Sequence, residues 1–177
     1  PDSLLKVNTG VYGLREAPRL WYLKANRILL ENGWEELKMA RSCYVLRDKR
    51  GKNKLVGMLL LYVDDACFGG FGPLYDKTIK ATLAKFTVGK TQEDEFDFLG
   101  RHVTQRKDFS IEVDMDKYLR GLERVFIPMA RRRQSTSPLT PKELHDYRSI
   151  VGQLAWPARQ VMPQLAYHVS DLQQKTA

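Results

Sequence analysis

The spacing of apolar positions predicts a helix followed by a hairpin in the first part of the chain. An apolar stripe at helical intervals lies between Pro18, which suits a first helical turn, and Gly33, which suits a helix end. The stripe consists of Trp21, Ala25, Ile28 and Leu29. The apolar runs 42–47 and 55–63 flank the polar stretch 48–53 and predict two strands joined by a loop. A short return strand, 66–68, is expected next.

The middle of the chain predicts a second helix and a second hairpin. The helix is expected over 73–86, with Leu74, Ile79, Leu83 and Phe86 facing inward. Residues 91–97 are expected to form an acidic loop. Runs 98–105 and 109–113 predict a hairpin that turns near Lys107 and Asp108. Asp114 is expected to cap a further helix that carries Tyr118, Leu119, Leu122, Val125 and Phe126.

The last third of the chain predicts helices separated by one linker. Residues 127–140, with three consecutive arginines (131–133), are expected to form a solvated linker. Thr140 and Glu143 form a capping box, which predicts a helix to about Ala155, and a last helix is expected from Pro163. The pattern is therefore α+β to about residue 113 and helical afterwards.

Composition narrows the class of protein. The chain has 177 residues, 43% hydrophobic, which is enough for a folded core and argues against intrinsic disorder. Two cysteines, Cys43 and Cys67, exclude a disulfide scaffold and a zinc ribbon and suit a reducing compartment. The apolar run 56–63 is far too short to span a membrane. We therefore expect an intracellular protein, cytoplasmic or nuclear and not secreted.

Charge is unevenly distributed along the chain. The net charge of +8 divides into +6 for residues 1–54, −2 for 55–112 and +4 for 113–177. Two basic flanks around an acidic middle are what a polyanion-binding groove with a metal-holding centre would require, although ordinary solvated surfaces give the same sums.

Two adjacent carboxylates carry the clearest chemistry. Asp64 and Asp65 follow the apolar run that ends in Tyr62 and Val63, on a strand that we expect to be buried on both faces. Carboxylates at a buried position must take up a proton, pair with a basic side chain or bind a cation. Mg²⁺ prefers oxygen ligands of this kind. Such a pair serves two-metal phosphoryl transfer, but two aspartates also suit a plain hairpin turn. Both interpretations stay open on these residues alone.

Further motifs separate the two interpretations. The segment YGLREAPRLWY (12–22), the YVDD box (62–65), FLG (98–100), and the later SPL (137–139) and YRSIVGQL (147–154) occur in this order. Together they resemble copia-type (Ty1/copia, Pseudoviridae) LTR retrotransposon reverse transcriptases over nearly the whole chain. Asp64 and Asp65 stand at the catalytic positions of that family.

The resemblance implies a right-hand polymerase fold and roles for particular residues. Residues 1–113 would be a partial palm, an antiparallel sheet with packed helices, and 114–177 a helical thumb or connection region. Asp64 and Asp65 would bind Mg²⁺, two ions in the complete enzyme, with Mn²⁺ as an alternative. Nucleotide or template contacts would come from Tyr12, Gly13, Arg15, Pro18, Arg19, Tyr62 and Val63. Phe98, Leu99 and Gly100 would form the primer grip.

The same resemblance implies partners and missing parts. An RNA template, a DNA primer and a dNTP would bind, and fingers, integrase and RNase H would belong to the same polyprotein. The family's third carboxylate lies in a strand upstream of the YGL box, and nothing before Val11 supplies it. Fingers and the first palm strand would therefore be missing, and we expect a fragment that does not polymerise alone. Gln164 stands where the family has an aspartate.

Two other functions remain in view. A degenerate retroelement remnant would only bind nucleic acid through its basic flanks, and another palm-fold phosphoryl transferase, such as a nucleotide cyclase, would use the same aspartates. His102, His145 and His168 lack metal-ligand spacing, so we expect surface or packed histidines. Trp34 and Trp156 are expected in the core rather than stacked on bases.

Overall fold

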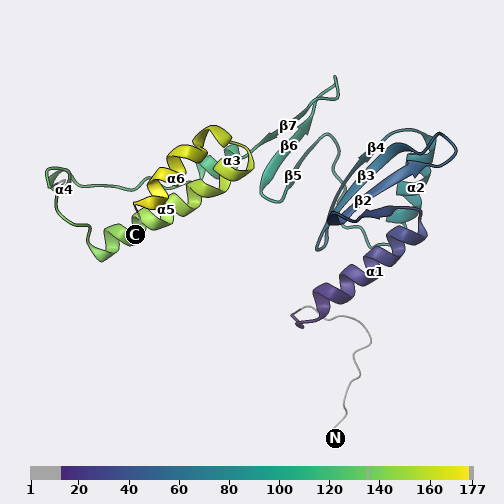
Figure 1. The fold of residues 1–177 in the computed structure, drawn as a ribbon, viewed down its shortest axis with the longest axis horizontal. Coiled ribbons are helices and arrows are strands. Elements are labelled where there is room, and N and C mark those ends of the chain that lie inside the picture. Colours follow the sequence, from purple (N-terminus) through teal and green to yellow (C-terminus); the bar gives the residue numbers. More distant parts are fainter. Residues whose placement is uncertain (1–12, 135, 176–177) are drawn as a thin grey trace, which may run out of the picture. The chain divides into compact units, whose positions relative to one another are not determined.

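The computed structural model describes residues 13–134 and 136–175 (Figure 1). They form two compact units, the first ending at Thr91 and the second beginning at Gln92. Each unit combines one antiparallel sheet with helices, so the predicted α+β class is confirmed. The sheet of residues 95–114 groups with the helices that follow it. Residues 1–113 as palm and 114–177 as thumb or connection region remain predictions.

The first unit is a four-stranded antiparallel sheet with two helices packed on it. Helix α1 spans Ala17–Glu31, and β1 (Glu35–Leu37), β2 (Ala40–Asp48), β3 (Lys54–Tyr62) and β4 (Asp65–Gly70) lie in the sheet in chain order before helix α2 (Pro73–Leu83). One buried cluster joins α1, α2 and the sheet. It contains Leu29, Trp34, Tyr44, Leu46, Val56, Leu59, Tyr75 and Ile79. The predicted helix, hairpin and return strand are confirmed, whereas β1 was not predicted.

Polar contacts fix α1 on the sheet along its length. The Tyr22 hydroxyl donates to Glu36 Oε1 at 2.7 Å, and the Tyr44 hydroxyl donates to Asn26 Oδ1 at 3.0 Å. The hydrogen bond to Glu36 raises the pKa of Tyr22, and burial raises that of Tyr44, so both stay protonated donors. Helix α1 therefore cannot slide on the sheet without leaving buried polar groups unpaired.

Helix α2 packs through a face that matches the prediction only in part: Ile79 is buried and Leu83 packs partly buried against the core, as expected. Its buried residues are Tyr75, Thr78, Ile79 and Thr82, whereas Leu74 is exposed. Thr82 Oγ1 donates to the Thr78 carbonyl at 2.8 Å and accepts from Trp34 Nε1 at 3.0 Å. Because these bonds satisfy the threonine hydroxyl, a polar residue can occupy the core side, and an apolar pattern alone cannot identify that side.

Two glycines make room for Tyr75 against the sheet. Gly57 and Gly70 are cross-strand partners on β3 and β4. A Cβ built on Gly57 would meet the Tyr75 ring at 2.6 Å, and one on Gly70 would meet that ring at 2.3 Å. A Cβ built on Gly69, one residue earlier, would meet no atom within 4 Å. The packing of α2 on the sheet thus depends on Gly70 and does not depend on Gly69.

The second unit contains a three-stranded antiparallel sheet and a helical pair. Strands β5 (Glu95–Phe98), β6 (Arg101–Gln105) and β7 (Ile111–Asp114) are followed by α3 (Asp116–Arg120), α4 (Met129–Arg132), α5 (Pro141–Gln160), the 3₁₀ turn η1 (Pro163–Leu165) and α6 (Ala166–Gln174). Helix α6 packs against α5, where the Tyr147 hydroxyl donates to the Leu172 carbonyl at 2.8 Å. The predicted capping box of Thr140 and Glu143 is confirmed.

A proline inside α5 explains how α3 attaches to it. Pro157 has no N–H, so it cannot donate to the Gln153 carbonyl one turn earlier. The Tyr118 hydroxyl from α3 donates to that carbonyl instead, at 3.0 Å. Pro157 itself is buried. The helix therefore continues to Gln160, past its predicted end near Ala155.

Two local predictions are wrong. The loop predicted over 91–97 contains most of β5, whose partly buried Phe96 and Phe98 alternate with exposed acidic residues. The helix predicted from Asp114 to Phe126 ends at Arg120, and Phe126 is exposed. Gly121 follows directly, and β-branched Val125 has a low helix propensity; Val125 and Phe126 are exposed, so they bury little apolar surface that would stabilise a helix.

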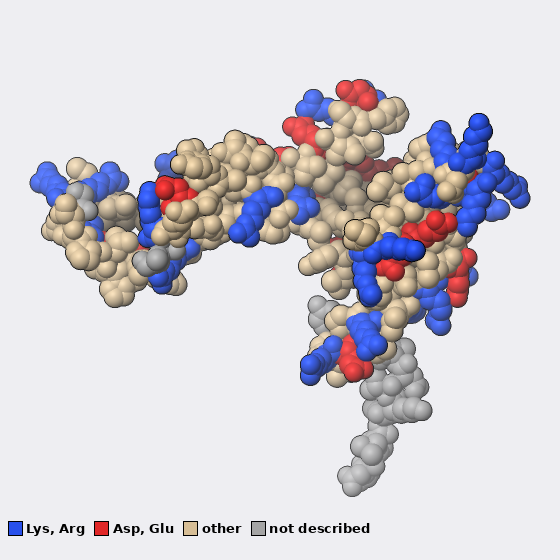
Figure 2. All heavy atoms as spheres, viewed as in Figure 1, with Lys and Arg blue, Asp and Glu red and all other residues tan. Residues whose placement is uncertain are grey.

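The acidic middle of the sequence is divided between the two units of the structure. The acidic middle, 55–112, contributes β3, β4 and α2 to the first unit and β5–β7 to the second. Lys and Arg gather most densely over the β2–β3 end of the first unit (Figure 2). In the described part of the chain, every helix is too short or too polar to cross a membrane.

We expect Gly70→Ala to destabilise the chain while Gly69→Ala does not. The new methyl group at position 70 must displace the Tyr75 ring, which should lower the free energy of unfolding by about 1–3 kcal/mol. Gly69→Ala should stay within about 0.5 kcal/mol. Urea unfolding followed by tryptophan fluorescence measures both. Equal losses in the two variants would contradict the packing argument.

Candidate active site

The two aspartates lie at the turn between β3 and β4. Tyr62 pairs with Asp65, so only Val63 and Asp64 form the loop of the hairpin; we call residues 62–65 the aspartate turn. Val63 has φ +53°, and Asp64 does not have positive φ, which is the sign pattern of a type II′ turn. Glycine usually occupies that first position, so a β-branched valine there is strained. Such strain points to a functional constraint at this turn.

Both carboxylates are exposed and available. Neither Asp64 nor Asp65 has an ion pair or a side-chain hydrogen bond with any described residue. Across the described ranges there is no group of three or more His, Cys, Asp or Glu able to hold a metal ion. Two neighbouring oxygen donors suit Mg²⁺ as part of a ligand set, and the described residues do not complete that set.

Trp21 ties α1 to the aspartate turn. Its indole Nε1–H donates to the carbonyl oxygen of Val63, and its ring meets Phe86 edge-on with centroids 5.9 Å apart. Trp21 lies just over one turn into α1, so the N-terminal end of α1 is the end held at this turn. The sequence predicted Trp21 only as part of an apolar stripe. Its polar role could not be found from periodicity.

Strand β3 is not buried on both faces, which corrects the prediction. Val56 and Leu59 are buried, but Met58 and Tyr62 are about half exposed. Leu59 belongs to the buried cluster under the helices, whereas the opposite face is only partly covered: Val45, the cross-strand partner of Met58, is buried, but Met58 itself is exposed. Strand β4 is the last strand of this sheet, and no described strand pairs with its outer edge. The aspartates therefore sit at an accessible corner rather than a buried one.

Of the seven predicted nucleotide-contact residues, four lie before or within the first turn of α1, and Tyr62 and Val63 belong to the aspartate turn. Tyr12 lies outside the described residues. Gly13 has φ +91°, a conformation that favours glycine, and Pro18 occupies the first turn of α1. Arg15 and Arg19 are exposed and form no ion pair with a described residue. These side chains thus gather at the helix end that Trp21 holds at the aspartate turn.

The FLG element is a tight turn, not the start of a strand as predicted. Phe98 pairs with Arg101, so Leu99 and Gly100 form a two-residue loop. Both have positive φ, +51° and +74°, the sign pattern of a type I′ turn. Gly100 suits this turn, whereas Leu99, like Val63, is a non-glycine residue in the left-handed region. Roles for these residues in gripping a primer remain predictions.

Comparisons with known proteins agree with the motifs. The profile of the reverse transcriptase (RNA-dependent DNA polymerase) family matches residues 1–129. The chain belongs to the copia-type reverse transcriptase family. It is 31% identical to the Retrovirus-related Pol polyprotein from transposon RE2 of Arabidopsis thaliana, over 98% of this chain and 12% of that protein. It is 29% identical to the corresponding RE1 polyprotein, over the same shares of each chain.

A further relative is the putative transposon Ty5-1 protein of Saccharomyces cerevisiae, 27% identical over 97% of this chain and 58% of that protein. This chain therefore spans about an eighth of the two Arabidopsis polyproteins. No solved structure matches it significantly. The predicted family resemblance is confirmed, and membership argues against a nucleotide cyclase.

A charged cluster flanks the FLG turn of this reverse transcriptase chain. His102 Nδ1 lies 2.9 Å from Asp97 Oδ1, and Lys117 Nζ lies 3.3 Å from Asp97 Oδ2. Glu95 and Asp114 complete the acidic surroundings of His102. The hydrogen bond between His102 and Asp97 is the main cause that raises the pKa of His102 and lowers that of Asp97. His102 is a surface histidine in an ion-pair cluster.

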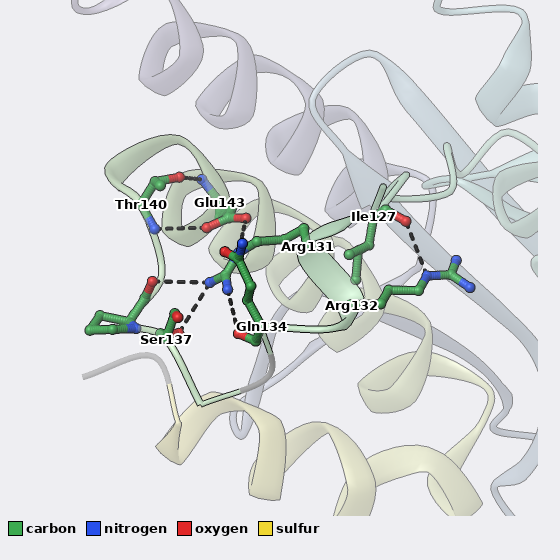
Figure 3. Close-up of polar contacts among 8 residues, drawn as sticks. Ile127, Arg131, Arg132, Gln134, Ser137, Thr140 and Glu143 are labelled. Atoms are coloured by element: carbon green, nitrogen blue, oxygen red, sulfur yellow. Dashed lines mark hydrogen bonds and ion pairs between the residues drawn. The ribbon is translucent and has the colours of Figure 1, made fainter. Parts of the chain in front are cut away.

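Arg131 organises the segment that was predicted as a solvated linker. Its guanidinium donates to Glu143 Oε1 at 2.6 Å and to the Gln134 and Ser137 carbonyls at 2.7 and 3.1 Å (Figure 3). The bond from Arg131 lowers the pKa of Glu143 to about 2. The Arg131 side chain is thus largely covered and stabilises the capping box of α5. For this residue the solvated-linker prediction is wrong.

Further observations concern Cys67, Trp34 and Trp156. Burial raises the pKa of the Cys67 thiol, which favours a packed thiol over a nucleophile. Trp34 is buried in the core as predicted, whereas Trp156 is partly exposed.

We expect Trp21→Phe to destabilise the aspartate turn. Phenylalanine retains an aromatic ring near Phe86 but loses the donor to the Val63 carbonyl, so the free energy of unfolding should fall by about 1 kcal/mol. Tyr62→Phe, in the same turn, removes a hydroxyl without a partner and should change little. Urea unfolding compares the two, and no difference between them would exclude the hydrogen bond.

We expect the His102–Asp97 pair to stabilise the folded state only within a limited pH range. The raised pKa of His102 gives stability that is complete below its ordinary value of 6.5 and is lost as pH rises through its folded value. The lowered pKa of Asp97 gives stability that is present above 3.8 and is lost as pH falls through its folded value.

The control separates this pair from general effects of pH. The stability difference between the native chain and His102→Gln should be largest between these two ordinary pKa values and shrink on both sides, as thermal unfolding measures. His145→Gln, at an exposed histidine, should show no such window. A pH-independent difference at His102 would contradict the assignment.

Proposed function

We propose that this chain is the palm-containing part of an RNA-directed DNA polymerase of a copia-type retrotransposon. Asp64 and Asp65 supply two of its metal-binding carboxylates. The observation that carries the proposal is a pair of exposed, unpartnered carboxylates on a strained two-residue turn, in a chain of the reverse transcriptase family.

The carboxylate oxygens would hold Mg²⁺, with Mn²⁺ as the alternative, against the phosphates of a dNTP. When bound, two such ions would lower the cost of charge on the attacking primer hydroxyl and on the leaving pyrophosphate. The protein's part is positional. Trp21 fixes the turn that carries Asp64, and the pairing of Tyr62 with Asp65 fixes the second carboxylate beside it.

The N-terminal end of α1 is suited to phosphate groups. The helix dipole favours anions there, and exposed Arg15 and Arg19 add charge at the same end, although the Ala17 N–H is taken by the Leu14 carbonyl and Pro18 has no N–H. We assign nucleotide and template contacts to Gly13, Arg15 and Arg19, and support of the primer end to Phe98–Gly100. Template RNA, primer DNA and dNTP are the partners of this proposal.

Completion of the site requires residues of the parent protein beyond the described ones. The open edge of β4 begins at Asp65, so an added strand there would place its side chains beside the aspartates. We propose that an upstream palm strand pairs with this edge and brings the third carboxylate. By this proposal the chain alone does not extend a primer. Fingers, integrase and RNase H would belong to the same polyprotein.

The alternative, a degenerate remnant that only binds nucleic acid, is not favoured by any observation. A remnant freed from catalytic constraint has no reason to keep Val63 strained between β3 and β4. The two proposals differ in one measurable property, metal-dependent nucleotide addition.

We expect Asp64→Asn to abolish primer extension by this chain joined to its upstream polyprotein region. Asparagine retains the shape but removes the charge that holds Mg²⁺, so incorporation on a primed RNA template should fall at least about 100-fold. Asp76→Asn, at an exposed carboxylate on α2, should retain activity. Circular dichroism should show both variants folded. Near-normal extension by Asp64→Asn would refute the assignment.

A further inference from the structure

The loop between β2 and β3 concentrates positive charge at one end of the first sheet. Residues 47–54, which we call the basic loop, contain five basic side chains and one acid; the basic residues are Arg47, Lys49, Arg50, Lys52 and Lys54. Figure 2 shows Lys and Arg gathered at this end of the first unit. No other eight residues in the chain carry so many.

Hydrogen bonds give the basic loop a defined shape. The backbone N–H of Gly51 donates to the Asp48 carbonyl, and that of Lys54 to the Gly51 carbonyl, each at 3.2 Å. The Asp48 carboxylate accepts the Arg50 backbone N–H at 2.9 Å. Lys52 and Asn53 both lie in the left-handed region, at φ +56° and +60°. Lysine rarely adopts this conformation, so the loop presents its charges from a constrained backbone.

Most of this charge is not neutralised within the chain. The side chains of Arg50 and Lys52 form no ion pair with any described residue. Lys49 pairs with Glu35 at 3.2 Å, but both side chains are exposed, and such pairs contribute little.

An exposed aromatic ring lies beside the basic loop. Phe71 is 56% exposed, and Lys54 Nζ lies 5.0 Å from its ring centroid. The Phe71 N–H donates to the Val56 carbonyl at 2.9 Å, which holds the residue beside the start of β3. Basic side chains next to an exposed aromatic ring are the combination that binds single-stranded nucleic acid, through phosphates and a stacked base.

The basic loop is remote from the aspartate turn. The two lie at opposite ends of β3, whose nine residues separate them by about 26 Å at 3.3 Å per residue. Charge in solution is screened over about 8 Å at physiological salt. The basic loop therefore cannot act by attracting phosphates to Asp64 and Asp65, and must make contacts of its own.

We propose that the basic loop and Phe71 form a binding surface for single-stranded nucleic acid, separate from the catalytic site. Lys49, Arg50 and Lys52 contact phosphates, and an unpaired base stacks on Phe71. A duplex hides its base faces and would engage only the charges. The proposal depends on the proposed function only in taking nucleic acid as the substrate.

Charge removal tests the phosphate contacts. A triple variant, Lys49→Gln, Arg50→Gln and Lys52→Gln, is compared with Lys77→Gln, Lys80→Gln and Lys85→Gln, which removes the same charge at and just after α2. Fluorescence anisotropy measures binding of a labelled 12-nucleotide RNA by the full chain between 50 and 200 mM KCl. The loop variant should bind at least about tenfold more weakly at low salt, with a logarithmic salt slope smaller by about 2. Equal effects in both variants would overturn the proposal.

Aromatic substitution tests the stacked base. Phe71→Leu should weaken binding of the single strand about tenfold and leave binding of a duplex of the same sequence unchanged. Phe109→Leu, at an exposed phenylalanine in the β6–β7 turn, is the matched control and should change neither. Equal losses for single strand and duplex would exclude base stacking on Phe71.

Asp64→Asn separates this surface from the polymerase proposal. It should bind the single strand as the native chain does, because Asp64 lies at the far end of β3. Normal binding together with lost primer extension supports both proposals. Intact extension refutes only the catalytic assignment, and intact binding by the loop variant refutes only the basic loop.

Discussion

Because only two residues join β3 to β4, Val63 must turn the chain at positive φ, and the placement of both aspartates depends on this. Tyr62 and Asp65 pair across the hairpin, so Asp64 is fixed at its tip and Asp65 at the first position of the returning strand. A valine does not favour this conformation by itself. The cost is offset from outside the turn, by the hydrogen bond that Trp21 donates to the Val63 carbonyl. The YGL segment and the YVDD box, about 40 residues apart in sequence, therefore form one structural element.

The rest of the first unit keeps Trp21 where this bond requires it. Helix α1 is fixed by Tyr22 to β1 and by Asn26 to β2, and the following Trp34 is buried and bonded to Thr82 of α2. Helix α2 in turn reaches the sheet because Gly57 and Gly70 leave room for Tyr75. None of these contacts involves Asp64 itself, yet each of them restrains α1. We infer that core packing in this unit determines the geometry of the aspartate turn.

Sequence patterns predicted those elements whose signals are local. The helix after Pro18, the β2–β3 hairpin and the Thr140–Glu143 capping box each have their signal within a few residues. The missed features depend on partners distant in sequence. Arg131 binds Glu143, Tyr118 supplies the donor that Pro157 lacks, and Thr82 is satisfied by Trp34. For the candidate site, the motif singled out the residues, whose roles remain predictions, whereas the strained turn and its link to Trp21 could only be found in three dimensions.

Strand β3 places opposite chemistry at its two ends. Its C-terminal end leads into two unpartnered carboxylates, and its N-terminal end begins in a loop with five basic side chains. A strand paired on both sides changes length very little, so the separation of about 26 Å is fixed by the sheet. Salt screens each end from the other. A nucleic acid that contacted both ends would therefore span a constant distance, so under the two proposals β3 would hold a bound template strand at a set distance from the aspartate turn.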